Sequence, residues 1–275
     1  MEFLNSPEPW SGATRGPTLG MVELIENGTV PVDAAAALWW AVERGASFFV
    51  VAGPGSAGKT TLANALLGFL PENAQLYAVD GSRDRIEVSR SDAPLYLLIN
   101  ELSDHMERYV QGAAALRAFA LLRSGYRMIG TLHADSAAEA LAVMQEDSGI
   151  PQSDAVRIPL ILVLRPADPG SVAGWRLEPD AERRLVQIGV VAPAAPDPVV
   201  RDFAAWDPAA GRLVRRPAPG GVAALAAWSG TAPETAQDEI AIRATMLQQL
   251  VSSGRRAPAA IANLIRDQRR SGSVA

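Results

Sequence analysis

The chain has 275 residues, a formal net charge of −5 and no cysteine. This length fits one large α/β domain, alone or with a small second module, and 48% hydrophobic residues are enough to bury a core. Without cysteine there are no disulfides or thiolate metal sites, and the acidic balance argues against nucleic-acid binding. No apolar run approaches ~18 residues and the first residues lack a basic segment, so we expect a cytoplasmic protein, free or peripheral at the inner face of the membrane.

The first 45 residues predict a lead-in followed by two helices. Residues 1–17 are rich in proline, glycine and serine, which is typical of a flexible segment. Two helices should follow, with a turn at Asn27-Gly28 between them, and the second should end at Gly45.

A glycine-rich loop lies between an apolar run, Phe48 to Val51, and the start of a helix, Leu62 to Leu67. The run is short enough for a buried parallel strand. The loop fits G-x-x-x-x-G-K-[ST], the Walker A phosphate loop, at every fixed position. Its residues and the next threonine are Gly53, Pro54, Gly55, Ser56, Ala57, Gly58, Lys59, Thr60 and Thr61. The glycines let backbone N–H groups turn toward a phosphate at the positive end of the helix, so we expect this loop to bind ATP.

Lys59 is the only lysine, and the other 24 of the 25 basic residues are arginine. The compact ammonium is therefore kept where a planar guanidinium would not substitute. We expect Lys59 to reach the outer phosphates and Thr60 to hold Mg²⁺. The plain alternative is a glycine-rich turn without a ligand, which the flanking strand and helix disfavour.

Later apolar runs predict further elements of an α/β fold. Strands are expected at 75–79, 95–99, 126–130 and 160–164, with helices at about 109–122 and 137–144 and a polar loop at 81–92. Alternating strands and helices predict a mainly parallel sheet with crossover helices on both faces.

The composition changes after Arg165-Pro166. We expect antiparallel strands at 184–191 and 203–214, the second interrupted by a turn, and a final helical pair at 234–253 and 258–270. The predicted regions are a lead-in (1–17), an ATPase core (18–165), a strand pair that continues the core (166–216), a linker (217–233) and a C-terminal helical region (234–275). Arginines of the tail form either a solvated helix face or a contact with an acidic partner or membrane surface; they are Arg255, Arg256, Arg266, Arg269 and Arg270.

Two further residues are expected at the carboxyl edge of the sheet, beside the loop. Glu101 follows the 95–99 strand, where it would polarise a water and help to hold Mg²⁺ through water. His133, one of two histidines, follows a later strand and would sense the γ-phosphate. The plain alternatives are a surface carboxylate and a structural histidine.

The segment GTLHADSAAEAL resembles the histidine box of the ATPases that power type II and type IV secretion, type IV pili and the archaellum, T-x-H-A-[DN]-S-x-x-E-A. The fitting residues are Thr131, His133, Ala134, Asp135, Ser136, Glu139 and Ala140. Similar stretches around the phosphate loop and at IAIRATMLQQLVSSG extend the resemblance over roughly residues 18–270.

The resemblance implies a RecA-like P-loop domain that hydrolyses ATP with Mg²⁺ in a hexameric ring, a homo-oligomer that works with a membrane platform protein. It implies Lys59 and Thr60 as the Walker A pair, Glu101 as the Walker B glutamate and His133 as the histidine-box residue. Glu101, Lys59 and His133 are thus the candidate catalytic residues, and Thr60 and Glu101 the candidate metal-binding residues.

Three departures from the family pattern bear on turnover. Only about 17 residues precede the matching region, where relatives carry a separate N-terminal domain. The stretch from Asp80 to Asp92 is shorter than the family's acidic box and arginine-bearing region. The family's Gly-Glu-x-Arg-Asp reads Asn100-Glu101-Leu102-Ser103-Asp104, so its arginine is missing.

These departures predict measurable ATP binding with slow hydrolysis, stimulated by a partner subunit or by self-assembly. The in-chain arginines expected to act across a subunit boundary are Arg83, Arg85 and Arg90. The alternative function is a nucleotide-binding regulator or degenerate ring subunit with little hydrolysis. A small-molecule P-loop kinase is disfavoured because no lid or acceptor-site signature is visible.

Overall fold

The computed structural model describes residues 1–8, 10, 19–83, 85–88, 92–178, 180–256, 261 and 263–266. The strands are β1 (Glu2–Phe3), β2 (Phe48–Val51), β3 (Gln75–Ala78), β4 (Leu95–Ile99), β5 (Arg127–Leu132), β6 (Leu160–Pro166), β7 (Val172–Ala173), β8 (Arg176–Leu177), β9 (Arg183–Ala192), β10 (Val199–Asp207) and β11 (Arg212–Arg215). The helices are α1 (Met21–Glu26), α2 (Val32–Glu43), α3 (Lys59–Leu67), α4 (Gly112–Leu121), α5 (Ala137–Ala142), α6 (Gln152–Ala155), α7 (Gly221–Ser229) and α8 (Pro233–Ser252), with short helical turns at Leu122–Ser124, Val143–Asp147 and Pro169–Ser171.

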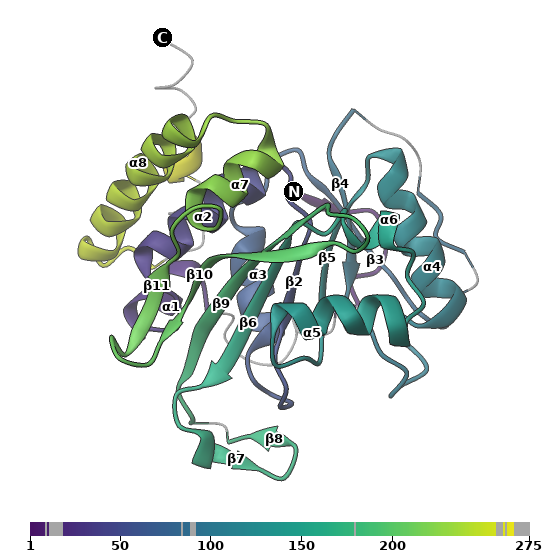
Figure 1. The fold of residues 1–275 in the computed structure, drawn as a ribbon. Coiled ribbons are helices and arrows are strands. Elements are labelled where there is room, and N and C mark those ends of the chain that lie inside the picture. The colour runs from purple at the N-terminus through teal and green to yellow at the C-terminus, as the bar shows by residue number, and fades with distance from the viewer. Residues whose placement is uncertain are drawn as a thin grey trace.

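One sheet organises the described residues, with strand order β1-β3-β4-β5-β2-β6-β9-β10-β11 (Figure 1). The strands from β1 to β6 run parallel to their neighbours, whereas β9, β10 and β11 continue the sheet antiparallel. The mainly parallel α/β sheet with an antiparallel C-terminal extension is therefore confirmed. Because β2 is the middle strand of the nine-stranded sheet, between β5 and β6, the loop after β2 reaches the carboxyl edge at the centre of the sheet.

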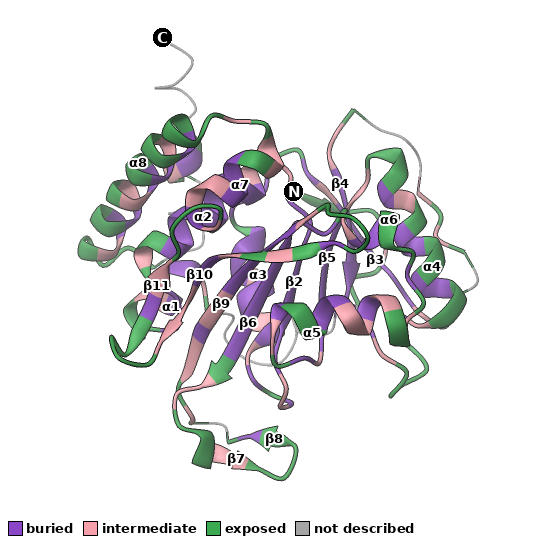
Figure 2. Ribbon diagram, viewed as in Figure 1, coloured by how far each residue is buried: buried purple, intermediate pink, exposed green. Residues whose placement is uncertain are grey.

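Helices cover both faces of the sheet, and β2 shows why. Its four residues are fully buried and alternate between the faces: Phe48 and Val50 belong to one apolar cluster, Phe49 and Val51 to the other. The first cluster includes residues of α2, α3, α7 and α8, and the second includes residues of α4 and α5. Figure 2 shows the central strands as continuously buried ribbons between these layers. A strand buried on both faces is an unbroken apolar run, which is why the sequence reveals it.

The predicted linker at 217–233 is wrong, because it contains the helix α7. Proline and glycine at its start suggested a loose chain, but Gly220 and Gly221 only form the turn that enters the helix. The next residues are alanine-rich, and Ala224, Leu225 and Ala226 are buried in the core.

The C-terminal helical region is packed on the core. The helix α8 lies beside α2, and Arg243 of α8 pairs with Glu43 of α2 at 2.7 Å, both side chains being largely buried. Trp40 of α2 donates its indole N–H to Glu239 of α8 at 2.6 Å. The expected boundary near residue 233 is therefore not a break in packing.

The lead-in is partly ordered, unlike the flexible segment expected for residues 1–17. Its strand β1 pairs in parallel with β3 at the edge of the sheet. Trp10 is 1% exposed and donates its indole N–H to Asn64 of α3 at 2.6 Å. Burial of a large aromatic ring whose N–H has a hydrogen-bond acceptor stabilises a fixed conformation, even in a segment rich in proline and glycine. Residues 9 and 11–17 lie outside the described residues.

Two arginines of the tail pair with carboxylates of the chain itself. Arg256 lies 2.7 Å from Glu26, and Arg266 lies 3.1 Å from Glu72. Most of the second helix predicted at 258–270, including Arg269 and Arg270, lies outside the described residues. Among the helices that the structure describes, none is long and apolar enough to span a bilayer.

Candidate active site

The glycine-rich loop connects β2 to α3 at the carboxyl edge of the sheet, as expected. Two residues take left-handed backbone angles, Ser56 with φ 61° and Gly58 with φ 88°, and Gly58 is the residue that starts the helix. Left-handed residues between right-handed neighbours turn successive N–H groups toward one side, and α3 adds the positive end of its dipole. The loop has the geometry of an anion cradle.

Lys59, Glu101 and His133 come together at this edge although they are far apart in the chain. The Lys59 ammonium lies 3.8 Å from Glu101 Oε2 and 3.2 Å from His133 Nε2. The side chains of Lys59 and Glu101 are only 8% and 9% exposed. Charges held in a water-poor site interact more strongly than at the surface. All three candidate catalytic residues therefore line one pocket.

Glu101 is positioned by the neighbouring strand β5. The Thr131 hydroxyl lies 2.8 Å from Glu101 Oε2 and also contacts the Asn100 carbonyl, and Leu102 N–H donates to the Thr131 carbonyl at 2.8 Å. The other carboxylate oxygen, Glu101 Oε1, is buried and has no hydrogen-bond partner among the described residues. A buried carboxylate oxygen without a partner is costly unless a ligand or water occupies the space before it. Glu101 Oε1 is thus an open acceptor, that is, a buried oxygen without a hydrogen-bond partner among the described residues, on a residue that lines the cavity.

His133 links the loop to the same carboxylate. Its Nδ1 lies 2.8 Å from the Gly53 carbonyl, which can only accept, so Nδ1 carries the proton. Its Nε2 then faces Lys59, and it lies 3.6 Å from Glu101 Oε1. The ring of His105, the second histidine, lies edge-on to His133 with centroids 6.2 Å apart. His133 therefore bridges the Gly53 end of the loop, Lys59 and Glu101.

The rest of the histidine box has local structural roles. Ser136 caps α5 by accepting the Glu139 N–H at 3.1 Å, and the Glu139 carboxylate accepts the Asp135 N–H at 2.7 Å. The Asp135 carboxylate lies against Gly53, where an added Cβ would be 2.3 Å from Oδ1. These hydrogen bonds fix the loop that carries His133, and the Asp135 side chain would have to move if position 53 carried a Cβ.

The pocket also contains residues that the sequence did not reveal. Its volume is about 410 Å³, and its lining comprises Gly55, Ser56, Ala57, Gly58, Lys59, Thr60, Thr61, Glu101, Tyr109, His133, Trp175 and Arg176. Tyr109 precedes α4, and Trp175 and Arg176 belong to the β7–β8 hairpin. Two-residue strands in a polar segment carry no periodic signal, so only the fold brings this hairpin to the site.

Two ionisable groups in the pocket have shifted pKa values. Burial lowers the pKa of Lys59, and the charge and hydrogen bonding of Glu101 oppose that shift. Burial raises the pKa of Tyr109, the charge of Glu101 raises it further, and Arg176 opposes the rise. Glu101 therefore helps to keep Lys59 in its charged form.

Two of the three expected cross-subunit arginines, Arg83 and Arg85, do not line this pocket. Arg83 is 3.7 Å from Asp80, and Arg85 is exposed. Asp80 also accepts from Ser82 at 2.7 Å, and although burial acts in the other direction, these hydrogen bonds and the charge of Arg108 lower its pKa. Asp80 is thus already engaged by its own loop. Arg90 lies outside the described residues.

The residues present fit a magnesium ion that is bound mainly through a nucleotide. No group of three or more histidine or carboxylate side chains that could hold a metal alone occurs in the described residues. Mg²⁺ usually keeps waters and phosphate oxygens and needs only one or two protein ligands. The Thr60 hydroxyl at the start of α3 and the open oxygen of Glu101 match that need.

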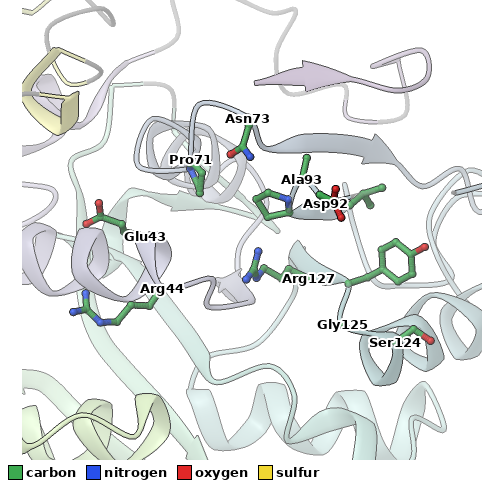
Figure 3. Close-up of a pocket in the computed structure, with 12 residues that line it drawn as sticks. Glu43, Arg44, Pro71, Asn73, Asp92, Ala93, Ser124, Gly125 and Arg127 are labelled. Carbon is green, nitrogen blue, oxygen red and sulfur yellow. The ribbon is translucent and has the colours of Figure 1, made fainter. Parts of the chain in front are cut away.

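A larger cavity, of about 860 Å³, lies at the opposite edge of the sheet, where β4 and β5 begin (Figure 3). Three of its charged residues have partners. Arg44 pairs with Glu239 and its guanidinium lies 4.1 Å from the centre of the Trp40 ring, and Glu43 pairs with Arg243. The Arg127 guanidinium lies 5.5 Å from the centre of the Tyr96 ring. These charges hold elements together, and the fourth, Asp92, is exposed.

No family model matches the chain. An uncharacterized protein of Methanocaldococcus jannaschii is 31% identical over 127 residues, which are 46% of this chain and about a fifth (22%) of that protein. Two solved structures show weak similarity. The VirB11 ATPase of the Brucella suis type IV secretion system, in complex with sulphate, has 14% identity and a TM-score of 0.35, with 68% of this chain and 64% of that one covered. The Legionella pneumophila ATPase DotB has 12% identity and a TM-score of 0.31, with 83% and 58% covered. The assignment of the site rests on its own geometry.

Proposed function

We propose that the chain is a Mg²⁺–ATP-binding, RecA-like ATPase of the secretion and pilus motor type, which hydrolyses ATP to ADP and phosphate. One observation carries this proposal. The only lysine of the chain stands in a glycine-rich loop, 3.8 Å from a buried carboxylate whose other oxygen has no hydrogen-bond partner among the described residues. Phosphate binding needs the lysine and the loop amides, and water activation needs the open carboxylate.

The side chains divide the reaction between them. Lys59 and the loop amides hold the β- and γ-phosphates, and bound Mg²⁺ would offset further charge on these oxygens. Glu101 Oε1 accepts a hydrogen bond from a water, which orients its oxygen toward the γ-phosphorus. As the bond between the water oxygen and the γ-phosphorus forms, the bond from the γ-phosphorus to the bridging oxygen breaks. The bridging oxygen keeps the electron pair and remains on ADP, and a water proton passes to the Glu101 carboxylate. When phosphate leaves, His133 transmits the change to the loop through its hydrogen bond to the Gly53 carbonyl.

Assembly and partners follow as further parts of the proposal. The family resemblance supports a homo-oligomeric ring that acts on a membrane platform protein of a pilus or secretion system. Turnover then rises with self-assembly, because a neighbouring subunit excludes water from the site.

One observation favours the alternative, a nucleotide-binding regulator or ring subunit with little hydrolysis. Ser103 stands where the resembled family carries an arginine, and its hydroxyl is buried without a hydrogen-bond partner among the described residues. That position supplies no positive charge to the transition state.

Calorimetric titration and phosphate release separate these functions. Under the proposal, Mg²⁺–ATP binds with one site per chain, and phosphate release per chain rises with protein concentration. Binding without release at any concentration would establish the regulator instead. Absence of binding would refute both, and fast turnover independent of concentration would refute the ring.

A further inference from the structure

The β7–β8 hairpin is attached directly to the phosphate loop. It lies between β6 and β9 and extends beyond the sheet at the carboxyl edge, at the bottom of Figure 1. Gly55 N–H donates to the Trp175 carbonyl at 2.7 Å, and Leu177 N–H donates to the Gly55 carbonyl at 2.9 Å. Leu177 is buried and anchors the hairpin, whose other residues are mostly exposed (Figure 2). The loop amides from Ser56 onward are not used by this pairing.

The tip of the hairpin places an aromatic ring and a cation against the loop. A Cβ at Gly55 would be 2.6 Å from the Trp175 ring, so the indole lies directly on the loop backbone. The Arg176 guanidinium lies 4.3 Å from the centre of that ring. Trp175 is nevertheless 65% exposed, unusual for a tryptophan that no other chain covers.

Arg176 faces the reacting side of the pocket. It lines the same cavity as Lys59, Glu101 and His133. It is also near enough to Tyr109 to oppose, through its charge, the rise in the Tyr109 pKa that burial and Glu101 cause. No carboxylate pairs with Arg176 in the part of the chain that the structure describes. With Lys59 offset by Glu101, Arg176 gives the pocket one positive charge in excess. A cavity with an excess positive charge attracts an anion, and a guanidinium suits the oxygens of a phosphate.

The opposite side of the loop differs. A second cavity, of about 420 Å³, shares Ser56, Ala57, Gly58 and Thr61 with the first. The leucines Leu19, Leu24, Leu62 and Leu164 line it together with the polar or charged residues Asn27, Thr29, Asp180, Glu182 and Arg183, and its two carboxylates disfavour phosphate there. Arg183 is on that side, with its Cδ 3.7 Å from a Cβ added at Gly58. A nucleoside suits the apolar side, which leaves the outer phosphates on the side of Arg176.

We propose that Arg176 binds the terminal phosphate of ATP, held in place by the Trp175 ring and by the pairing of the hairpin with Gly55. This inference rests on the proposed function and deepens it. The hairpin of the chain then supplies the positive charge at the terminal phosphate that Ser103 does not supply. Because ADP lacks that phosphate, Arg176 distinguishes ATP from ADP.

The test compares affinities for a non-hydrolysable ATP analogue and for ADP, both with Mg²⁺, by calorimetry at protein concentrations where the chain is monomeric. In Arg176→Ala the analogue should bind about tenfold or more weakly, whereas ADP affinity should stay within about twofold. Arg176→Lys should recover part of the preference because it keeps the charge. The matched control is Arg212→Ala, an exposed arginine of the β10–β11 hairpin, which should change neither affinity.

Tryptophan emission gives a second readout that does not depend on turnover. The analogue should change the emission of the wild-type chain, and most of that change should be lost in Trp175→Phe. Circular dichroism of each variant shows whether it is folded, and Arg176→Lys replaces Arg176→Ala if the latter is not.

The outcomes separate this inference from the proposed function. If the wild-type chain binds neither nucleotide, the proposed function fails and the inference falls with it. If the wild-type chain binds both and Lys59→Ala binds neither, the function stands. In that case, an Arg176→Ala variant that keeps the wild-type preference, or that weakens both nucleotides equally, shows that Arg176 only braces the hairpin and overturns the inference.

Discussion

The two edges of the sheet carry cavities of opposite character. At the edge where β4 and β5 begin, the cavity is about 860 Å³, yet its charged residues Arg44 and Glu43 are satisfied by the partners Glu239 and Arg243. At the carboxyl edge the pocket is about half that volume, and Glu101 keeps an open oxygen. Volume therefore does not identify the site. The site is identified instead by where the unpartnered oxygen lies, because Glu101 lines a pocket together with Lys59 and the glycine-rich loop.

Of the substitutions that test this difference between the two edges, replacement of Lys59 should have the largest effect on ATP binding. Lys59→Ala removes the charge that meets the phosphates in a water-poor loop, so Mg²⁺–ATP binding should weaken by about 4 kcal/mol. Titration calorimetry measures the loss. Arg44→Ala, at the other edge, is the control and should leave the dissociation constant unchanged. Equal affinities of Lys59→Ala and the wild type would rule out the phosphate-loop assignment.

Arg243→Ala should show that the charges of the opposite edge are structural. It removes the guanidinium that lies 2.7 Å from the largely buried Glu43 carboxylate, which should lower the free energy of unfolding by about 3 kcal/mol. Denaturant unfolding gives this value. ATP affinity of the folded variant should not change, and a change of tenfold or more would mean that the two edges are coupled.

Glu101→Gln should separate binding from hydrolysis at the carboxyl edge. It removes the water-orienting carboxylate but leaves the phosphate loop, so ATP should still bind while turnover falls about a hundredfold. Phosphate release under saturating ATP measures the effect. Unaffected turnover would transfer the role to another carboxylate, for example Asp104, since Asp80 is held by its own loop.

The smallest effect concerns the ionisation of Lys59. The Glu101 carboxylate favours the ammonium and so raises its pKa against the lowering by burial. Glu101→Gln should therefore lower the pKa of Lys59 further, and ATP affinity should begin to fall at a lower pH than in the wild type. Because the chain has one lysine, ¹³C-lysine labelling reports this group directly by NMR. An unchanged or higher pKa would contradict the pairing.

The sequence predicted the elements that depend on local pattern. β2 and β4 were predicted with the bounds that the structure has, because fully buried strands are unbroken apolar runs. The residues at their carboxyl ends followed from the parallel topology, so Lys59, Glu101 and His133 were expected together. Trp175 and Arg176 were not, since their strands are two residues long and pair with the loop only in the folded chain. α7 was missed because the proline and glycine residues just before it are typical of a linker, so the apolar residues that follow were not assigned to a helix.

The short strand β1 affects how the protein behaves in concentrated solution. It covers the outer edge of β3 with two residues, and Asn5 continues the contact by binding Ala78 through both its amide oxygen and its amide nitrogen. Without residues 1–8, the backbone groups of β3 would be open to pair with a strand of another molecule. Versions of the chain that are shortened or tagged at this end would then associate by pairing of their β3 edges. Such clusters would imitate ring assembly in a sizing experiment, so assembly is best measured on the chain with its first residues intact.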